Sequence, residues 1–221
     1  MQSTLIRSKH SQRRAIIVKP MNPMVLPGAL FFTLALLLAA SAAVIHLEVV
    51  NISGNAGENS LIEYLQEAYL FLTGSLFAAV AIRRPSQRGF AVLASAFFYM
   101  LMIRELDGLF DLISHGFWKY PAWLLATSAI IYGVRHKAVT TQPLIDYTQH
   151  RSFGLMLAGM GTLLVFARLF GMGDLWQALM QDAYIRPVKN LAEEGTELLA
   201  YTLIAFAAAW YCLPTLLKKS R

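Results

Sequence analysis

Six predominantly apolar stretches, most of them about twenty residues long, occupy the greater part of this 221-residue chain. A helix needs about 20 mostly apolar residues to cross the hydrocarbon core of a bilayer. The stretches cover residues 27–47, 61–82, 89–114, 121–134, 153–171 and 191–213. The fourth is the shortest and needs residues 117–120 to reach the length of a span. The pattern predicts an all-α, polytopic membrane protein with six transmembrane helices in a bundle.

The composition excludes several other classes of protein. Hydrophobic residues make up 57% of the chain and charged residues 14%, with a mean hydropathy of +0.50. Soluble domains are about half apolar and about a quarter charged, so neither a water-soluble globule nor a disordered chain fits. A single cysteine, Cys212, rules out a disulfide scaffold. The net charge of +6 does not indicate nucleic acid, because the basic residues follow the predicted topology.

The distribution of Lys and Arg predicts the orientation of the spans. Fourteen of these residues fall in the N-terminal arm, the second and fourth connections and the C-terminal tail, and three fall in the opposite connections. Cytoplasmic segments carry the excess of basic residues. We therefore expect a bacterial inner-membrane protein with both termini cytoplasmic. It would have a basic arm at 1–26, a transmembrane domain at 27–217 and a basic tail at 218–221.

Acidic residues concentrate in the outer parts of three predicted spans. Eight of the 13 lie there, and the inner parts of the spans contain none. The eight are Glu63, Glu67, Glu105, Asp107, Asp111, Glu193, Glu194 and Glu197. Arg168 is expected at the same depth, near the outer end of the fifth span. Four helices therefore bring ionisable groups to one level of the bilayer.

Helical phase predicts that these groups face one another. Arg104, Asp107, Asp111 and His115 are spaced 3, 4 and 4 residues apart, which makes one continuous polar stripe on a helix. Glu63 and Glu67 form a second acidic edge, and Glu194, Glu197 and Tyr201 form a third. A charged side chain near the bilayer centre costs about 2.5–3.5 kcal/mol on insertion scales, so the stripes should turn inward. Arg104 then needs a partner, for which Asp107 or a glutamate of the second span is the natural choice.

The excess of carboxylates indicates either bound protons or a bound cation, because carboxylates sharing a low-dielectric site cannot all ionise. We expect a divalent metal ion of undetermined identity, with Glu67, Asp111, His115, Glu194 and Glu197 as its ligands. The predicted catalytic residues are Glu67, Asp107, Asp111 and Glu197, and Arg104 and Arg168 are predicted to form ion pairs. An ion-pair network that only fixes helix register explains the same residues about as well.

The longest outer connection, 171–190, contains Leu175, Trp176, Leu179, Met180 and Tyr184 at helical spacing. Asp174 can cap this segment and Pro187 can end it. We expect an interfacial amphipathic helix between the fifth and sixth spans, as a cover or a lid. In the fifth span, the small residues Gly154, Ala158 and Gly161 predict a close approach to another helix.

Three functions fit the sequence, and whether the protein is an enzyme stays open. The first is metal-assisted hydrolysis or modification of a lipid or headgroup at the outer leaflet, with a glutamate as general base. The second is a proton- or cation-coupled transporter, although transport sites usually lie at the midplane in broken helices. The third is a non-catalytic subunit or sensor whose polar cluster is structural. The expected partners are membrane lipids and either another membrane protein or a second copy of the chain.

Carboxylates and a histidine gathered at one end of a multi-span protein resemble the arrangement in the alkaline-ceramidase and adiponectin-receptor group of membrane hydrolases. That resemblance implies a metal near one leaflet, bound largely by histidines that include a pair in the last spans. Here the last span carries Glu193, Glu194 and Glu197 and no histidine, and there are six predicted spans instead of seven. No family is assigned and no site is transferred.

Overall fold

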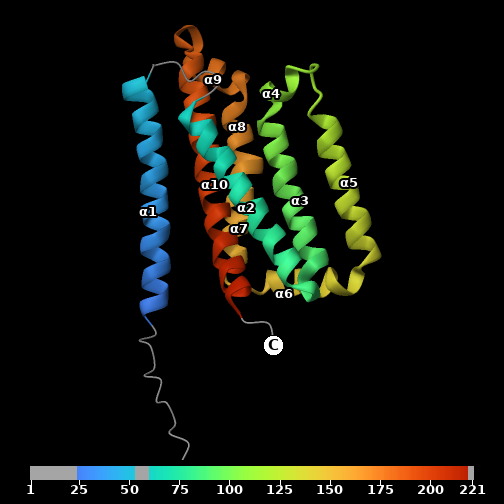
Figure 1. The fold of residues 1–221 in the computed structure, drawn as a ribbon. Helices are drawn as coiled ribbons and strands as arrows, with labels where there is room; N and C mark the ends of the chain where they lie inside the picture. The colour runs from blue at the N-terminus through green and yellow to red at the C-terminus, as the bar shows by residue number, and fades with distance from the viewer. Residues whose placement is uncertain (1–23, 53–59, 219–221) are drawn as a thin grey trace, which may run out of the picture.

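The apolar stretches form long helices in the computed structural model, which describes residues 24–52 and 60–218 (Figure 1). No β-strand occurs in these ranges, which confirms the all-α class. The principal helices are α1 (Val25–Leu47), α2 (Leu61–Arg83), α3 (Arg88–Glu105), α5 (Lys119–Arg135), α7 (Phe153–Gly161) and α10 (Arg186–Leu217). Shorter helices are α4 (Asp107–Asp111), α6 (Thr141–Thr148), α8 (Arg168–Gly171) and α9 (Gly173–Met180). The 3-10 segments η2 (Pro85–Gln87), η3 (Lys137–Val139) and η5 (Gln181–Ala183) lie in the connections.

Five helical segments of the described chain are long and apolar enough to cross a membrane. They are Val25–Val50, Leu61–Arg83, Pro85–Glu105, Phe153–Gly171 and Arg186–Leu217. The fourth of these contains α7, the π-helical segment η4 (Thr162–Ala167) and α8 in one continuous run. Helix α5 lies beside α3 (Figure 1), but its 17 residues rise only about 25 Å. The sixth crossing therefore stays a prediction.

The third long helix is shorter than the sequence pattern predicts. It ends at Glu105 instead of Ser114, because Leu106 leaves the helical conformation with φ −82° and ψ 20°. The five residues from Asp107 to Asp111 form the separate helix α4. This break separates residues that the 3-4-4 spacing had placed on one face.

The last helix begins earlier than expected. Pro187 lies in the first turn of α10, where a missing backbone N–H costs little, since no partner within the helix exists there. It therefore starts α10 and does not end the amphipathic segment. That segment, α9, stops at Met180, and Tyr184 lies beyond it.

Helix α10 is the central element of the bundle. It packs against α1, α2, α7, η4 and α8, while α2 packs against α3 and α3 against α5. Figure 1 shows α1 and α5 on opposite flanks of this arrangement. Helix α1 buries only Ser41, whose hydroxyl lies 2.9 Å from the Thr202 hydroxyl of α10. The same hydroxyl lies 3.3 Å from the Tyr69 hydroxyl of α2, so two interhelical contacts anchor the middle of α1.

An aromatic cluster forms the core between α2, α3, α6 and α10. The Phe77 ring stacks on Phe98 with centroids 6.0 Å apart and meets Phe90 edge-on at 5.9 Å. Tyr147 of α6 and Tyr211 of α10 complete the cluster at 4.6 Å from each other. Offset and edge-on pairs of this kind contribute beyond simple burial of area. They fix α10 against α2 and α3.

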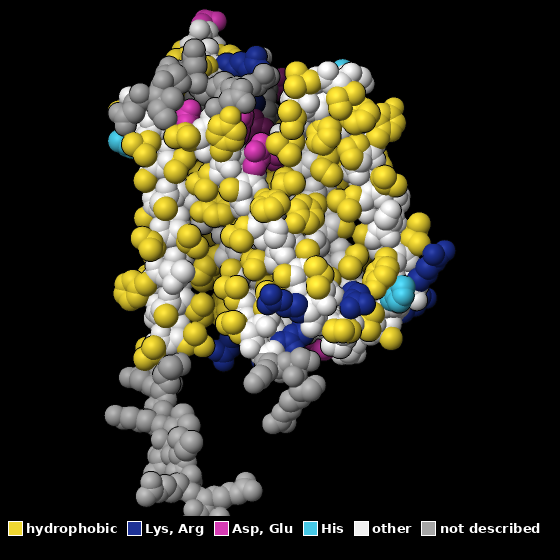
Figure 2. Space-filling model, in the orientation of Figure 1, with side chains coloured by type: hydrophobic (Ala, Val, Ile, Leu, Met, Phe, Trp, Pro, Cys, Tyr) yellow, Lys and Arg dark blue, Asp and Glu magenta, His cyan; other side chains and the backbone are white. Residues whose placement is uncertain are grey.

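The two ends of the bundle differ in charge, as Figure 2 shows. We call the end where α2 and α5 finish and α3 begins the basic end. Its described basic residues are Arg83, Arg84, Arg88, Arg135, Lys137, Arg151 and Lys218. The start of α1 and the end of α10 also lie at this end (Figure 1). The predicted basic arm and tail lie mostly outside the described residues.

The close approach of the fifth apolar segment to α10 involves a different glycine from those expected. A side chain at Gly159 would lie 2.7 Å from the Ile204 side chain and 3.1 Å from the Ala200 carbonyl oxygen. Gly154 and Gly161 have open space around them, and Ala158 is exposed. The predicted contact exists, but its small-residue face is rotated from the one that we expected.

Candidate acidic pocket

Helix α2 begins at the end of the bundle opposite the basic end, which we call the acidic end. Two carboxylates and a serine cap its first turn. Ser60 Oγ accepts a hydrogen bond from the Glu63 backbone N–H at 3.1 Å, and the Ser60 N–H donates to Glu63 Oε2 at 3.2 Å. Glu48, 6% exposed, accepts from the Leu61 N–H at 2.9 Å. Carboxylates are favourable at a helix N-terminus because its N–H groups lack partners within the helix. The cap fixes the start of α2 and the place of Glu63.

Arg104 and Glu105 form the centre of the polar contacts at the end of α3. Arg104 Nη2 lies 2.6 Å from Glu105 Oε1, and the Tyr201 hydroxyl donates to that same oxygen at 2.7 Å. The partner of Arg104 is thus its sequence neighbour, and neither Asp107 nor a glutamate of α2 is its ion-pair partner. Because Tyr201 is 1% exposed, this hydrogen bond ties the core of α10 to the pocket.

Helix α10 supplies three carboxylates in different surroundings. Glu193 is paired with Lys189 at 2.6 Å, one turn earlier on the same helix. Glu197 is 7% exposed and its Oε1 lies 3.6 Å from Arg168 Nη2. Glu194 Oε2 is buried and has no hydrogen-bond partner among the described residues. The Glu194 carbonyl oxygen, in contrast, accepts from the Gln66 amide at 3.0 Å.

Two π-helical segments position residues at the acidic end. Arg168 follows η4 directly, and Glu48 opens η1 (Glu48–Ile52) at the end of α1. A π turn holds one more residue than an α turn, so it rotates the following residues by about 100° relative to an unbroken α-helix. Helical phase counted from the sequence does not carry through such a segment.

These side chains line a pocket of about 240 Å³. Its lining residues are Glu63, Gln66, Glu67, Arg104, Glu105, Asp107, Arg168, Glu193, Glu194 and Glu197. Figure 2 shows acidic side chains set back between apolar surfaces toward this end of the molecule. Seven carboxylates thus face Arg104 and Arg168, with Lys189 beside them, so the pocket carries an excess of negative charge when all of them ionise.

A second, larger pocket shares one wall with the acidic pocket. It has a volume of about 490 Å³ and shares Glu63, Glu67, Glu105 and Asp107. Its other lining residues are mostly apolar: Tyr64, Leu106, Gly108, Leu109 and Leu112. A half-charged, half-apolar cavity of this kind suits an amphiphilic ligand.

Of the residues predicted for the site, the structure gathers Glu67, Asp107, Glu194 and Glu197, with Arg104 and Arg168. Asp111 and His115 do not line the pocket. They pair with each other at 2.8 Å on an exposed turn, where Asp111 also accepts from the Gly116 N–H at 2.8 Å. These bonds to Gly116 and His115 hold the pKa of Asp111 below its usual value. The break after Glu105 is the reason for the separation.

Three lining or supporting residues were not singled out from the sequence: Gln66, Lys189 and Glu48. The signal for Gln66 was available, since an amide inside an apolar span needs a partner. No group of three or more His, Cys, Asp or Glu residues in the described ranges is arranged to hold a metal ion.

No protein-family model, no curated protein and no solved structure matches this chain. Its class is therefore defined by its own architecture. Over residues 24–52 and 60–218 it is all-helical, with five helices long and apolar enough to cross a membrane and a charged pocket at one end of the bundle.

Proposed function

We propose that this is a multi-pass membrane protein that binds a cation in the acidic pocket. The observation that carries the proposal is the imbalance of charge: seven carboxylates line a pocket with two guanidinium groups. Carboxylates in a restricted space repel one another, and a cation or protons relieve that repulsion. The buried, unpartnered Glu194 Oε2 supports this interpretation, because a buried polar atom without a partner is costly.

We further propose six crossings of a bacterial inner membrane, with the basic end at the cytoplasmic face. Basic residues gather at one end of the bundle, as the positive-inside rule requires of a cytoplasmic face. The acidic pocket would then open at the outer leaflet. The packed aromatic core beneath it favours binding or chemistry at one face over transport through the bundle.

Cation binding is tested by thermal unfolding of the detergent-purified protein with MgCl2, CaCl2, MnCl2 or ZnCl2 against NaCl of equal ionic strength. An ion whose free concentration is 100 times its Kd stabilises the folded state by about 2.7 kcal/mol. Glu197→Gln should abolish the shift. Asp111→Asn, outside the pocket, and Asp146→Asn, at the basic end, should retain it. Equal shifts in all four proteins, or none in the wild type, would contradict the proposal.

A second candidate is metal-assisted hydrolysis of a lipid or headgroup bond. The neighbouring half-apolar pocket favours it, because a lipid entering there would bring its headgroup to Glu67 and Asp107, which line both cavities. A carboxylate-bound ion would activate water, and a glutamate would act as general base. Release of a headgroup or acyl chain from vesicles by the wild type and not by Glu67→Gln tests it. Equal release by both proteins would remove this candidate.

A further inference from the structure

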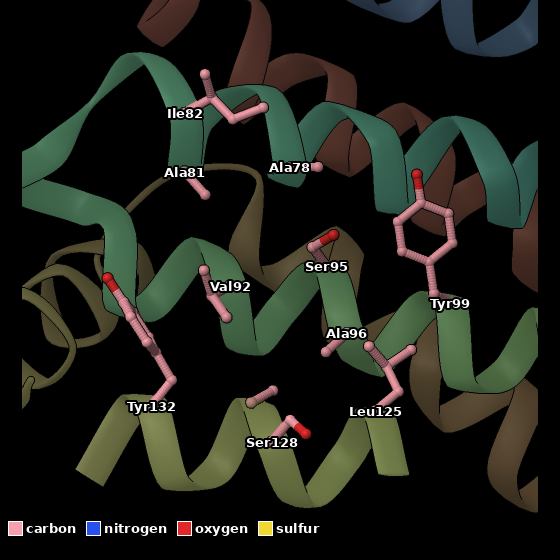
Figure 3. A pocket seen from close by; sticks show the side chains of 11 residues that line it. Ala78, Ala81, Ile82, Val92, Ser95, Ala96, Tyr99, Leu125, Ser128 and Tyr132 are labelled. Carbon is pink, nitrogen blue, oxygen red and sulfur yellow. The ribbon is translucent and has the colours of Figure 1, made fainter. Parts of the chain in front are cut away.

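A groove of about 520 Å³ opens on the side of the bundle and shares no lining residue with the acidic pocket. Figure 3 shows α3 lying between α2 and α5, with side chains from all three helices directed into the space between them. Small residues make much of this lining, among them Ala78 of α2, Ala96 of α3 and Ser128 of α5. Their size leaves the groove open.

The interior of the groove is suited to hydrocarbon. Of its four hydroxyl-bearing residues, Ser95 donates to the Gly74 carbonyl oxygen at 2.9 Å, and the Tyr99 hydroxyl lies 2.8 Å from Ser75 Oγ. Those two polar groups are therefore already satisfied within the protein. The remaining surface is almost wholly aliphatic or aromatic. The volume falls within the range of about 300–1,000 Å³ typical of small-ligand sites.

Basic side chains stand at one end of the groove. Arg88 lies one helical turn before Val92 on the α3 side, and its Nε donates to the carbonyl oxygen of Ala81, which lines the α2 side, at 3.0 Å. On the α5 side, Arg135 follows Tyr132 by three residues and so continues the same helix face. Arg88 of α3 and Arg135 of α5 thus lie about one helical turn beyond the lining residues of their helices, toward the basic end.

We propose that this groove binds one acyl chain of an anionic phospholipid, whose phosphate is bound by Arg88 and Arg135. The charge of the headgroup matches the end at which basic residues gather. Arginine pairs well with phosphate oxygens because its N–H donors form a planar fork. This binding does not depend on the cation proposed for the acidic pocket.

The length of the groove favours a lipid over the helix of a partner. Its lining on α3 runs from Val92 to Tyr99 and on α5 from Leu125 to Tyr132, about 10 Å in each case. A transmembrane helix crosses about 30 Å of hydrocarbon, so this site would accommodate only a third of it. A groove of this length is sufficient to hold part of an acyl chain. The anionic headgroup of the same lipid then matches the basic residues at the end of the groove.

Native mass spectrometry of the purified protein with palmitoyl-oleoyl phosphatidylglycerol or phosphatidylcholine tests the proposal. We expect phosphatidylglycerol to be retained about thirtyfold better than phosphatidylcholine, since each of the two arginines contributes about 1 kcal/mol at an anionic headgroup. Arg135→Gln should reduce its retention about fivefold, as expected for one basic side chain at an anionic headgroup. Ala78→Leu fills the groove and should abolish retention of both lipids. Ala158→Leu, exposed on α7, is the matched control and should change nothing.

Equal retention of the two lipids would overturn the proposal, as would unchanged retention in Ala78→Leu. A protein dimer that Ala78→Leu dissociates would also overturn it, because the groove would then belong to a second copy. Should Ala78→Leu not fold, Ser128→Leu, exposed at the α5 side, replaces it with the same expected loss.

Discussion

Replacing Tyr201 by phenylalanine removes a single hydroxyl group beneath the acidic pocket and leaves the ring in place. That hydroxyl donates to Glu105 Oε1 at 2.7 Å, and Tyr201 itself is 1% exposed. The bond links α10 to the last residue of α3. We expect Tyr201→Phe to loosen this end of the bundle while the aromatic packing of the core persists.

The magnitude follows from what Glu105 retains. A hydrogen bond to a charged group is worth about 1.5–3 kcal/mol in soluble proteins, whereas interhelical hydrogen bonds in membranes average about 0.6 kcal/mol. Glu105 keeps Arg104 at 2.6 Å, and its side chain is 17% exposed. We therefore expect a loss of about 1 kcal/mol in the free energy of unfolding. For a chain of this size that corresponds to about 2–4 °C in Tm.

The measurement is equilibrium unfolding in mixed detergent micelles, followed by tryptophan fluorescence. Tyr211→Phe is the matched control, because Tyr211 is buried on the same helix and makes ring contacts. A double-mutant cycle with Glu105→Gln isolates the pair, and the two single losses should not add. Equal losses in Tyr201→Phe and Tyr211→Phe, or strict additivity in the cycle, would refute the reasoning.

Two further predictions concern other parts of the bundle. Gly159→Ala should cost about 1–3 kcal/mol, because its Cβ would lie 2.7 Å from the Ile204 side chain and 3.1 Å from the Ala200 carbonyl oxygen of the packed helix α10. Gly154→Ala, on the same helix with open space around it, should instead stabilise α7 by about 0.5–1 kcal/mol, and thermal unfolding compares the two. Burial and two nearby basic side chains lower the pKa of His150 from its usual 6.5. Below about pH 6.5 the unfolded chain therefore binds more protons at this residue than the folded protein does. The free energy of unfolding should then fall as the pH is lowered through this range. His150→Gln should flatten that part of the stability–pH curve, and an unchanged slope would contradict the assignment.

Helix continuity explains part of what the sequence predicted about the pocket, although Asp107 and Arg168, which follow a break and a π segment, also line it. Glu67, Glu194 and Glu197 lie on unbroken helices, and all three reach the pocket as the helical phase predicts. Asp111 and His115 do not, because α3 ends at Glu105 and phase has no meaning across a break. The Asp107-Gly108 pair, with its weak helix propensity, was a signal for that break.

Partners were less predictable than positions. Arg104 was expected to pair with Asp107 or with a glutamate of the second span, yet it contacts Glu105, its neighbour in the sequence. Likewise, Gly159 and not Gly154 or Gly161 meets α10. In both cases a rotation of less than one helical turn decides which neighbour a side chain contacts, and a sequence pattern does not resolve such a rotation.

The sequence alone determined that long apolar helices would form and that the acidic residues of the spans would gather at one end. Both follow from the cost of exposing peptide groups and carboxylates to hydrocarbon, which each segment incurs regardless of its neighbours. Only the tertiary structure decided which carboxylates share a cavity, because that depends on where helices break and how π segments rotate them. Packing between helices sets those angles, and it depends on several segments at once.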